Sequence, residues 1–158
     1  MKLSVLIDEQ QIFLNSTLED KASVLSFIST RAKEQGIVED ETILLNDFLS
    51  REKEYPTAVQ PGIAIPHAKS EAVKEAKLFF VRLNKEIDWD SPDNFNAQAI
   101  FAILVPKSES GSRHIKILSA LAVKLLEEEF QEAVFKAKDE AAILSLLNLE
   151  EEEGVDQV

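Results

Sequence analysis

The chain has 158 residues, of which 45% are hydrophobic and 29% are charged, with only 4 glycines and 5 prolines. This balance predicts one folded domain with a buried core, and it excludes a disordered, collagen-like or membrane-spanning chain. The absence of cysteine excludes disulfides, thiolate catalysis and sulfur-ligated metal sites. The 17 basic and 29 acidic side chains leave a net charge of −12, which disfavours nucleic acid and favours a basic protein partner.

The two ends of the chain carry few signals. The first residues combine one lysine with a short apolar run, which is too little for a secretory signal, and no later run is long enough to span a bilayer. We therefore expect a cytoplasmic protein without direct membrane insertion. An acidic run at residues 150–153 predicts a solvated tail over residues 150–158, after a domain that covers residues 1–149.

The first third of the chain predicts an edge strand followed by two helices. The strand falls in the segment that ends at about Leu14. The first helix starts between Thr17 and Asp20, and Gly36 is its C-terminal stop. The second helix starts at residue 39 or 40, ends between residues 51 and 54, and turns inward the apolar residues Ile43, Leu44 and Phe48.

The remainder of the chain predicts buried strands alternating with helices. Two nearly continuous apolar runs, residues 78–81 and 99–105, are typical of strands buried on both faces, and Trp89 is expected to anchor the loop between them. A polar loop then leads into a helix with Ile115, Leu118, Ala122 and Leu125 on one face, followed by shorter helices at 130–137 and 140–147. This order predicts an α/β fold of a single domain, with a mostly parallel, mixed central sheet and helices on both faces.

The two histidines of the chain occupy similar contexts. His67 follows an apolar strand that closes in Pro66, and His114 follows, after a loop, the apolar strand that closes in Pro106. If these strands run parallel, both histidines emerge at the carboxyl edge of one sheet, where open α/β sheets bind their ligands. Arg51, at the end of the second helix, is expected to reach the same edge.

These residue types suit phosphoryl chemistry. A neutral imidazole, with an ordinary pKa of about 6.5, is an available nucleophile near neutral pH, and its attack on phosphorus gives a phosphoramidate that can be passed on. Such transfer needs position and charge compensation, and the guanidinium of Arg51 can supply a bidentate cation. His114 falls in the first turn of its helix, where a neutral ring and free backbone amides favour an anion.

Other interpretations of the same residues stay open at the level of spacing. A histidine after a strand is commonly only a polar loop residue, and an arginine at a helix end commonly compensates the helix dipole. His114 is equally compatible with a ring in solvent. Two histidines and nearby carboxylates also raise zinc, but no His-x-x-x-His or comparable spacing occurs, so no metal and no cofactor is predicted.

A specific sequence motif distinguishes between these interpretations. Residues 61–68 read PGIAIPHA, which resembles the phosphorylation segment of the type 2 (fructose/mannitol-type) enzyme IIA domains of the bacterial phosphotransferase system. The pattern of that family is Arg-Glu, a short loop with a threonine, and Gly-Ile-Ala-Ile-Pro-His. Here it is matched by Arg51-Glu52, Thr57 and residues 62–67, while His114 matches a second histidine that opens a helix. The likeness extends from about residue 3 to residue 149.

The resemblance implies roles for these residues. His67 would accept a phosphoryl group from the histidine-containing phosphocarrier protein HPr and pass it to a sugar-specific IIB domain, with His114 and Arg51 flanking the group. The chain departs from the family at Ala58, Gln60 and Ala68, where glycines are usual, and a stiffer loop there bears on partner fit. The resemblance leaves the sugar unnamed, because the IIB and IIC parts largely set it.

Two alternative functions share the same motif. A nitrogen-type IIA protein is phosphorylated on the equivalent histidine but regulates other proteins through phosphorylation-dependent binding. A plain binding module would never become phosphorylated on His67.

Overall fold

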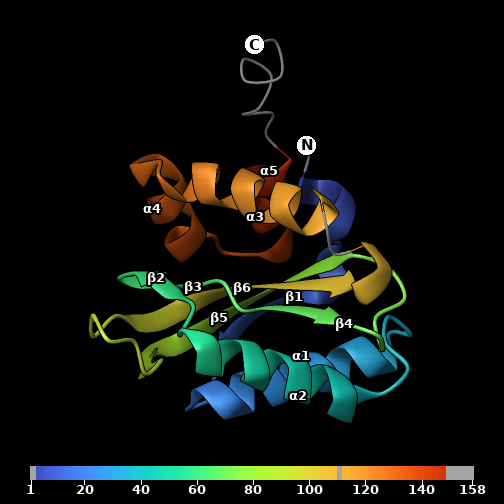
Figure 1. Cartoon of the computed structure of the whole chain (residues 1–158). Helices are drawn as coiled ribbons and strands as arrows, with labels where there is room; N and C mark the ends of the chain where they lie inside the picture. The colour runs from blue at the N-terminus through green and yellow to red at the C-terminus, as the bar shows by residue number, and fades with distance from the viewer. Residues whose placement is uncertain (1–2, 110–111, 149–158) are drawn as a thin grey trace.

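A six-stranded mixed sheet forms the middle layer of the protein, and helices cover both of its faces (Figure 1). The computed structural model describes residues 3–109 and 112–148, the side chains of residues 109 and 112–114 excepted. The acidic tail predicted over residues 150–158 lies outside the described residues. The strands are β1 (Ile12–Ser16), β2 (Ala58–Gln60), β3 (Gly62–Ala64), β4 (His67–Ser70), β5 (Lys77–Asp88) and β6 (Asn96–Pro106). The helices are α1 (Lys21–Glu34), α2 (Glu41–Glu54), α3 (Ser112–Leu125), α4 (Glu128–Lys136) and α5 (Glu140–Leu147), with short 3-10 helices at Leu3–Leu6, Glu9–Gln11 and Lys107–Glu109.

The helices α1 and α2 begin where capping side chains satisfy their first backbone amides. Asp20 accepts a hydrogen bond from the Ser23 amide at 2.7 Å, and Asp40 accepts from the Thr42 amide at 2.8 Å. Just beyond α1, Gly36 adopts a positive φ of 75°, as a glycine after a helix commonly does. The predicted starts and ends of these two helices are therefore confirmed. No helix among the described residues has both the length and the apolarity needed to cross a bilayer.

The strand order is β1-β5-β6-β3-β2, and β4 also pairs with β6. The pairs β1–β5, β3–β6 and β4–β6 are parallel, whereas β5–β6 and β2–β3 are antiparallel. The predicted fold class is thus confirmed, as is the position of the first strand at an edge of the sheet. The predicted apolar runs are the inner parts of β5 and β6, which form the centre.

Alternate side chains of β5 enter two separate cores. Phe79 and Val81 pack with α1 and α2, whereas Leu78 and Phe80 pack with the layer of α3, α4 and α5. Both faces of the central strands are therefore buried, as the unbroken apolar runs predict. Trp89 is fully buried beneath α1 and α2, which confirms it as the anchor of the loop after β5.

Two predicted helix faces are wrong in detail. In α2, Leu44 and Phe48 are buried as predicted, but Ile43 is exposed, because it lies about 100° around the helix from Leu44. In α3, the side chains that pack on the sheet include Ile117 and Leu121, while Ile115 is 62% exposed. Helix α3 carries apolar residues on more than one face, so periodicity could not decide which face the sheet would cover.

Candidate functional site

The turn before His67 follows from the residues of the motif. The chain reverses between β2 and β3 at Pro61-Gly62, and Gly62 has a φ of 84°, which a type II turn requires at its third residue. A β-carbon at Gly62 would also lie 3.2 Å from the ring of Phe135, so the position favours glycine on two grounds. This turn places β3 beside β6 and directs the chain toward His67.

His67 does not lie at the carboxyl edge of the sheet, which corrects the expectation from the sequence. The strand before it ends at Ala64, and His67 opens a further strand, β4, opposite Ile103 of β6. Pro66 lacks an N–H and interrupts the pairing, but its carbonyl still accepts from the Ile103 amide at 2.9 Å, so the chain continues along β6. The imidazole therefore stands at a break within the sheet. The expected parallel direction of the two strands is confirmed.

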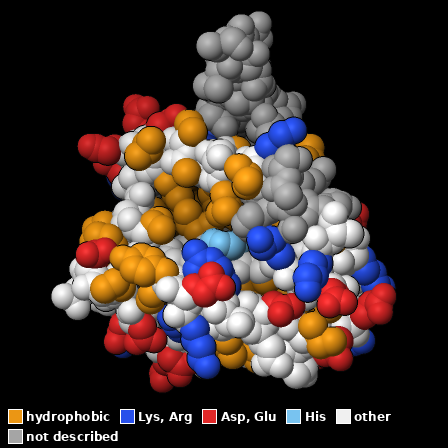
Figure 2. Space-filling view, in the orientation of Figure 1, with side chains coloured by type: hydrophobic (Ala, Val, Ile, Leu, Met, Phe, Trp, Pro, Cys, Tyr) orange, Lys and Arg blue, Asp and Glu red, His pale blue; other side chains and the backbone are white. Residues whose placement is uncertain are grey.

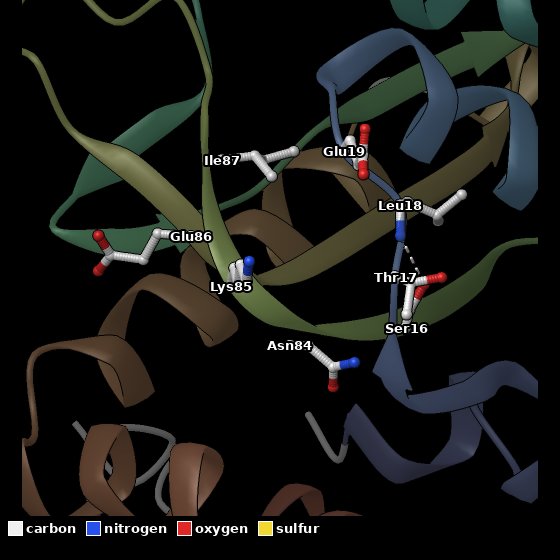
Figure 3. A pocket seen from close by; sticks show the side chains of 8 residues that line it. All are labelled: Ser16, Thr17, Leu18, Glu19, Asn84, Lys85, Glu86 and Ile87. Carbon is white, nitrogen blue, oxygen red and sulfur yellow. Dashed lines mark hydrogen bonds between the residues drawn. The ribbon is translucent and has the colours of Figure 1, made fainter.

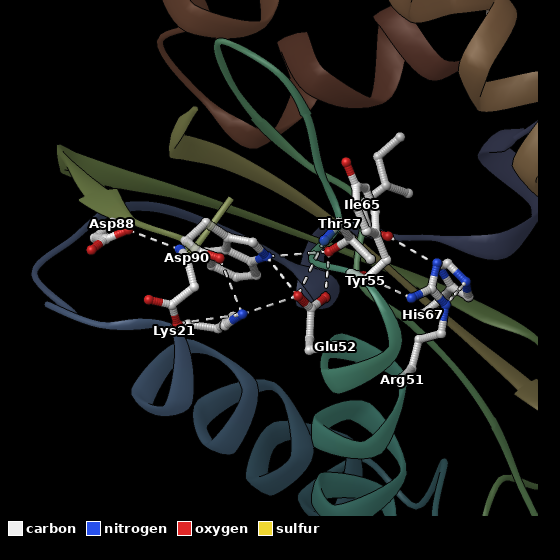
Figure 4. Close-up of polar contacts among 10 residues, drawn as sticks. Lys21, Arg51, Glu52, Tyr55, Thr57, Ile65, His67, Asp88 and Asp90 are labelled. Atoms are coloured by element: carbon white, nitrogen blue, oxygen red, sulfur yellow. Dashed lines mark hydrogen bonds and ion pairs between the residues drawn. The ribbon is translucent and has the colours of Figure 1, made fainter. Parts of the chain in front are cut away.

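Arg51 reaches His67, as expected from the sequence. It lies in the last turn of α2, and its Nε donates to Nε2 of His67 at 2.9 Å. Its Nη1 donates to the carbonyl of Tyr55 at 2.8 Å, which holds the guanidinium against the end of its own helix. One arginine thus connects the end of α2 to the imidazole (Figure 4).

These contacts define the tautomer of His67. Because a guanidinium only donates hydrogen bonds, Nε2 is the acceptor and carries the lone pair. Nδ1 then holds the proton and donates to the carbonyl of Ile65 at 3.1 Å. The ring is neutral in this arrangement, with its nucleophilic nitrogen directed toward a cation.

The surroundings of His67 keep the ring uncharged. Burial of the ring lowers its pKa below the ordinary value of 6.5, and the charges of Arg51 and Lys69 lower it further. The hydrogen bond to the carbonyl of Ile65 and the carboxylate of Glu54 raise the pKa, but these effects are outweighed. The imidazole is thus held neutral to lower pH than a histidine in solution.

A polar depression of about 290 Å³ lies on the α2 side of the imidazole. It is lined by Asp47, Ser50, Arg51, Glu54, His67, Ala68 and Lys69. Lys69 follows His67 by two positions in β4, so both side chains stand on the same side of the strand. Two cations from two elements therefore border the space next to the ring.

An apolar depression of about 340 Å³ lies on the other side of the imidazole, between β2 and α3. Its lining combines Arg51 and His67 with Tyr55, Pro56, Thr57, Val59, Gln60, Ile65, Leu118, Ala122, Leu125 and Leu126. Leu126 is 79% exposed, and Tyr55 and Val59 are also exposed. In Figure 2 the coloured histidine lies between a group of hydrophobic side chains and basic side chains.

His114 is the third residue of α3, so the predicted position in the first turn of a helix is confirmed for its backbone. Its side chain lies outside the described residues. Helix α3 itself borders the site, because Leu118 and Ala122 line the same depression as His67. The role of His114 stays a prediction.

The three departures from the family pattern lie in the strands β2 and β4. Ala58 and Ala68 are buried, and Gln60 donates from its amide to the carbonyl of Leu125 at 3.4 Å. None of the three has a positive φ among the described residues, so the fold does not demand glycine there. Gln60 connects β2 to the end of α3, across the apolar depression.

A third depression, of about 380 Å³, lies at a different part of the surface, between the β1–α1 connection and β5 (Figure 3). It is lined by Ser16, Thr17, Leu18, Glu19, Asn84, Lys85, Glu86 and Ile87. Within residues 3–109 and 112–148, no group of three or more histidine, aspartate or glutamate side chains is arranged to hold a metal ion.

Sequence reasoning missed three parts of the site: the Ile65 carbonyl, Lys69 and the buried carboxylate of Glu52. An extended segment from His67 onward would have placed Lys69 beside the imidazole, since alternate residues of a strand share a side. The Ile65 carbonyl leaves no signal in the sequence, because it is a backbone group. Glu52 belongs to the Arg-Glu pattern of the family, but its burial follows only from the tertiary structure.

A neutral, partly exposed imidazole next to an arginine suits phosphoryl transfer, which needs positioning and charge compensation. Residues 5–149 match the family described as "Phosphoenolpyruvate-dependent sugar phosphotransferase system, EIIA 2". The chain therefore belongs to this EIIA family and is a phosphotransferase component.

Curated relatives agree with this membership. The chain is 34% identical over 145 residues to the "PTS system fructose-specific EIIA component" of Haloferax volcanii, covering 92% of this chain and 94% of that protein. It is 30% identical over 141 residues to the "Multiphosphoryl transfer protein 1" of Escherichia coli, covering 89% of this chain and 17% of that protein. The chain thus spans nearly all of the first relative and about a sixth of the second.

Solved structures show the same fold at lower identity. The nitrogen regulatory protein IIA-Ntr of Neisseria meningitidis aligns with a TM-score of 0.83 at 24% identity, over 91% of this chain and 97% of that one. The mannitol IIA of Escherichia coli aligns with a TM-score of 0.75 at 23% identity, over 89% of this chain and 98% of that one. At these identities the likeness concerns the fold alone.

Proposed function

We propose that the protein carries a phosphoryl group on Nε2 of His67, accepting it from phosphorylated HPr and passing it to a sugar-specific IIB domain. The observation that carries the proposal is the contact of 2.9 Å between Nε of Arg51 and Nε2 of His67. It marks Nε2 as the nitrogen with the lone pair, and it puts a permanent cation where the oxygens of a phosphoryl group would gather. Arg51 and His114 are proposed to flank that group.

The transfer is a direct exchange of one nitrogen–phosphorus bond for another. The lone pair of Nε2 forms the new bond to phosphorus, and the bond to the donor's histidine breaks, with its electron pair returning to the donor ring. If that donor ring is protonated on its other nitrogen, it leaves as neutral imidazole, and no proton has to move. The ring of His67 becomes cationic, and the Ile65 carbonyl stabilises its Nδ1 proton.

Arg51 changes partner during this exchange. In the structure its Nε occupies the lone pair of Nε2, so the guanidinium has to shift to the phosphoryl oxygens as the bond to phosphorus forms. The Tyr55 carbonyl keeps the side chain close, which shortens that movement. Phosphoryl transfer asks the protein mainly for such positioning and charge compensation.

The apolar depression beside His67 supports a protein as the phosphoryl donor and acceptor. A small phosphorylated substrate would not bury exposed apolar side chains, whereas the centres of protein–protein interfaces are apolar. Leu126, Tyr55 and Val59 are all exposed around this depression. The relative named as a fructose-specific EIIA component makes a fructose-type IIB domain the first acceptor to test.

The deciding experiment is incubation with phosphorylated HPr, followed by mapping of the modified residue and nitrogen. We expect acid-labile label on Nε2 of His67, which a fructose-type IIB domain then removes. Label on another residue, or no label, would contradict the carrier assignment. Stable label that no IIB domain removes, together with a phosphorylation-dependent protein complex, would support the nitrogen-type regulatory alternative instead.

A further inference from the structure

A buried carboxylate lies next to Arg51 in the sequence but is directed away from His67. Glu52 is only 4% exposed. One of its oxygens accepts hydrogen bonds from the Thr57 amide at 3.2 Å, from Nε1 of Trp89 at 3.0 Å and from Nζ of Lys21 at 3.2 Å. Its other oxygen accepts from the hydroxyl of Thr57. Figure 4 shows Glu52 directed toward Thr57 and Lys21, while Arg51 is directed toward His67.

Burial of a carboxylate is costly unless its oxygens are paired, so this arrangement needs all of its donors. Lys21 supplies the opposite charge, and its Nζ also donates to the carbonyl of Trp89 at 3.1 Å. The donors come from the start of α1, the loop after β5 and the connection between α2 and β2. Glu52 therefore holds together three segments at the end of α2 that are far apart in the sequence.

Thr57 links this network to the carbonyl that orients His67. The backbone amide of Ile65 donates to the carbonyl of Thr57 at 2.9 Å, and the carbonyl of Ile65 accepts the Nδ1 proton of His67. Glu52 binds both the amide and the hydroxyl of Thr57. The position of the Ile65 carbonyl is thus coupled to Glu52 through one residue.

The same pair also sets the position of Arg51. Glu52 and Thr57 close the turn that follows α2, and this turn contains the Tyr55 carbonyl to which Arg51 donates. A hydrogen bond from Arg51 and a hydrogen bond to the Ile65 carbonyl both help to orient the imidazole. Both partners are therefore placed by the contact between Glu52 and Thr57.

We propose that Glu52 and Thr57 are positioning residues for His67: together they hold Arg51 and the Ile65 carbonyl on opposite nitrogens and so keep the lone pair on Nε2. Neither residue touches the nucleophilic nitrogen. The effect on phosphoryl transfer rests on the proposed function, whereas the effect on the tautomer concerns the imidazole alone. The two effects are therefore measured separately.

The test compares Thr57→Val with Thr57→Ser. Valine keeps the shape of the side chain but removes the hydroxyl that donates to Glu52 and accepts from Nε1 of Trp89 at 3.2 Å, whereas serine restores it. A misplacement of about 1 Å at a reacting group costs about 100-fold in rate. We expect Thr57→Val to lower the rate constant of transfer about 10-fold to 100-fold with an unchanged KM for phosphorylated HPr, and Thr57→Ser to restore it.

A contact between helices α1 and α2 provides a matched control for Thr57→Val. The hydroxyl of Thr30 in α1 donates to the carboxylate of Glu41 at 2.6 Å, at the opposite end of α2 from Arg51. Thr30→Val removes a hydroxyl–carboxylate contact of the same kind. We expect this variant to transfer phosphoryl groups and to orient His67 as the wild type does.

The tautomer is read by long-range ¹H–¹⁵N NMR, which suits a chain with only 2 histidines. His67→Gln assigns the signals. At a pH where the ring is neutral, we expect the wild type, Thr57→Ser and Thr30→Val to show the proton on Nδ1, and Thr57→Val to populate the other tautomer. If Thr57→Val does not fold, Glu52→Gln, which keeps the shape of the side chain, is measured by the same two readouts.

The outcomes separate this inference from the proposed function. A Thr57→Val protein with the tautomer and rate of the wild type would overturn the inference and leave the carrier assignment intact. Equal slowing in Thr57→Val and Thr30→Val would also overturn it, since the effect would then be one of general stability. If phosphorylated HPr fails to label the wild type, the proposed function fails, and the tautomer comparison still decides the positioning role.

Discussion

The two sides of the imidazole differ in what they offer. On the α2 side, Arg51 and Lys69 border a polar depression together with two carboxylates, those of Asp47 and Glu54. On the α3 side, Leu118 and Leu126 border a depression lined mostly by apolar side chains. His67 and Arg51 belong to both linings.

This difference separates two tasks that a phosphoryl carrier has to perform. Charge on the transferred group is compensated by side chains that the fold holds in place, whereas a second protein is bound by hydrocarbon that stays exposed until the partner arrives. The carrier proposal therefore expects changes on the polar side to slow the chemical step and changes on the apolar side to weaken partner binding. A split between rate constant and KM measures whether the two sides are independent.

The largest effect is expected from removing the nucleophile that both sides share. His67→Gln should abolish acid-labile labelling by phosphorylated HPr, because an amide cannot form the phosphoramidate. The loss is measured with radiolabelled or mass-tagged donor. Retained HPr binding by this variant, seen by chemical-shift perturbation, would show that the apolar side works without the nucleophile. Persistent labelling would show that another residue carries the phosphoryl group, and His67 would then not be the nucleophile that the two sides share.

A large effect is also expected on the polar side. Arg51→Ala should lower the rate constant of transfer about 100-fold, a loss typical of removing one donor to a developing anion, with little change in KM. Arg51→Lys keeps the charge but loses the planar fork, so an intermediate rate is expected. Rapid-quench kinetics at saturating HPr provide the measurement. A variant with a higher KM and an unchanged rate constant would assign Arg51 to partner binding.

On the apolar side a smaller effect is expected, and it should appear in KM and not in the rate constant. Burial of a leucine side chain contributes about 1.5 to 3 kcal/mol. Loss of such burial in Leu126→Ser should therefore raise KM for phosphorylated HPr about tenfold, at a nearly constant rate constant.

Val5→Ser is the matched control for this apolar variant, since Val5 is 66% exposed in the 3-10 helix at residues 3–6, away from the lining of the depression. The free energy of unfolding of both variants should equal that of the wild type within about 0.5 kcal/mol, because neither side chain is buried. Equal KM values for the two variants would contradict a partner surface at Leu126.

The smallest effect concerns the pKa of His67. Burial, Arg51 and Lys69 lower it, so the NMR titration midpoint of the wild type is expected below 6.5. Lys69→Ala removes one of the charges that lower the pKa and should therefore move the midpoint upward. Lys53→Ala, which removes an exposed charge from the same end of α2 outside the depression, should leave it in place. Equal shifts in both variants would show a general effect of net charge.

The same pKa predicts a dependence of stability on pH. The unfolded chain binds a proton at His67 more tightly than the folded chain does, so the folded state loses stability as pH falls from about 6.5 toward the lowered pKa. Above about pH 6.5 the folded state loses no stability through this titration. Urea unfolding between pH 5 and 8 measures it, with His67→Gln as the reference that lacks the titration. Parallel pH profiles for the two proteins would contradict the assignment.

Local rules and the pattern of apolar residues determined much of this protein. The helix starts at Asp20 and Asp40, the stop at Gly36 and the unbroken apolar runs in β5 and β6 follow from backbone geometry and side-chain period, and the structure bears them out. The reach of Arg51 to His67 also followed from the order of elements and the direction of strands. These features depend on neighbours in sequence or on one sheet.

The tertiary structure alone decided how His67 is held. Pro66 interrupts a strand without ending it, so His67 stands within the sheet and not at its edge. The face of α3 that stays exposed was set by which apolar surface fits the sheet, and the burial of Glu52 depends on Lys21, Thr57 and Trp89 meeting at one point. Hydrogen bonds to backbone carbonyls and the burial of a charge arise between distant segments, and a linear pattern of residue types does not encode distance.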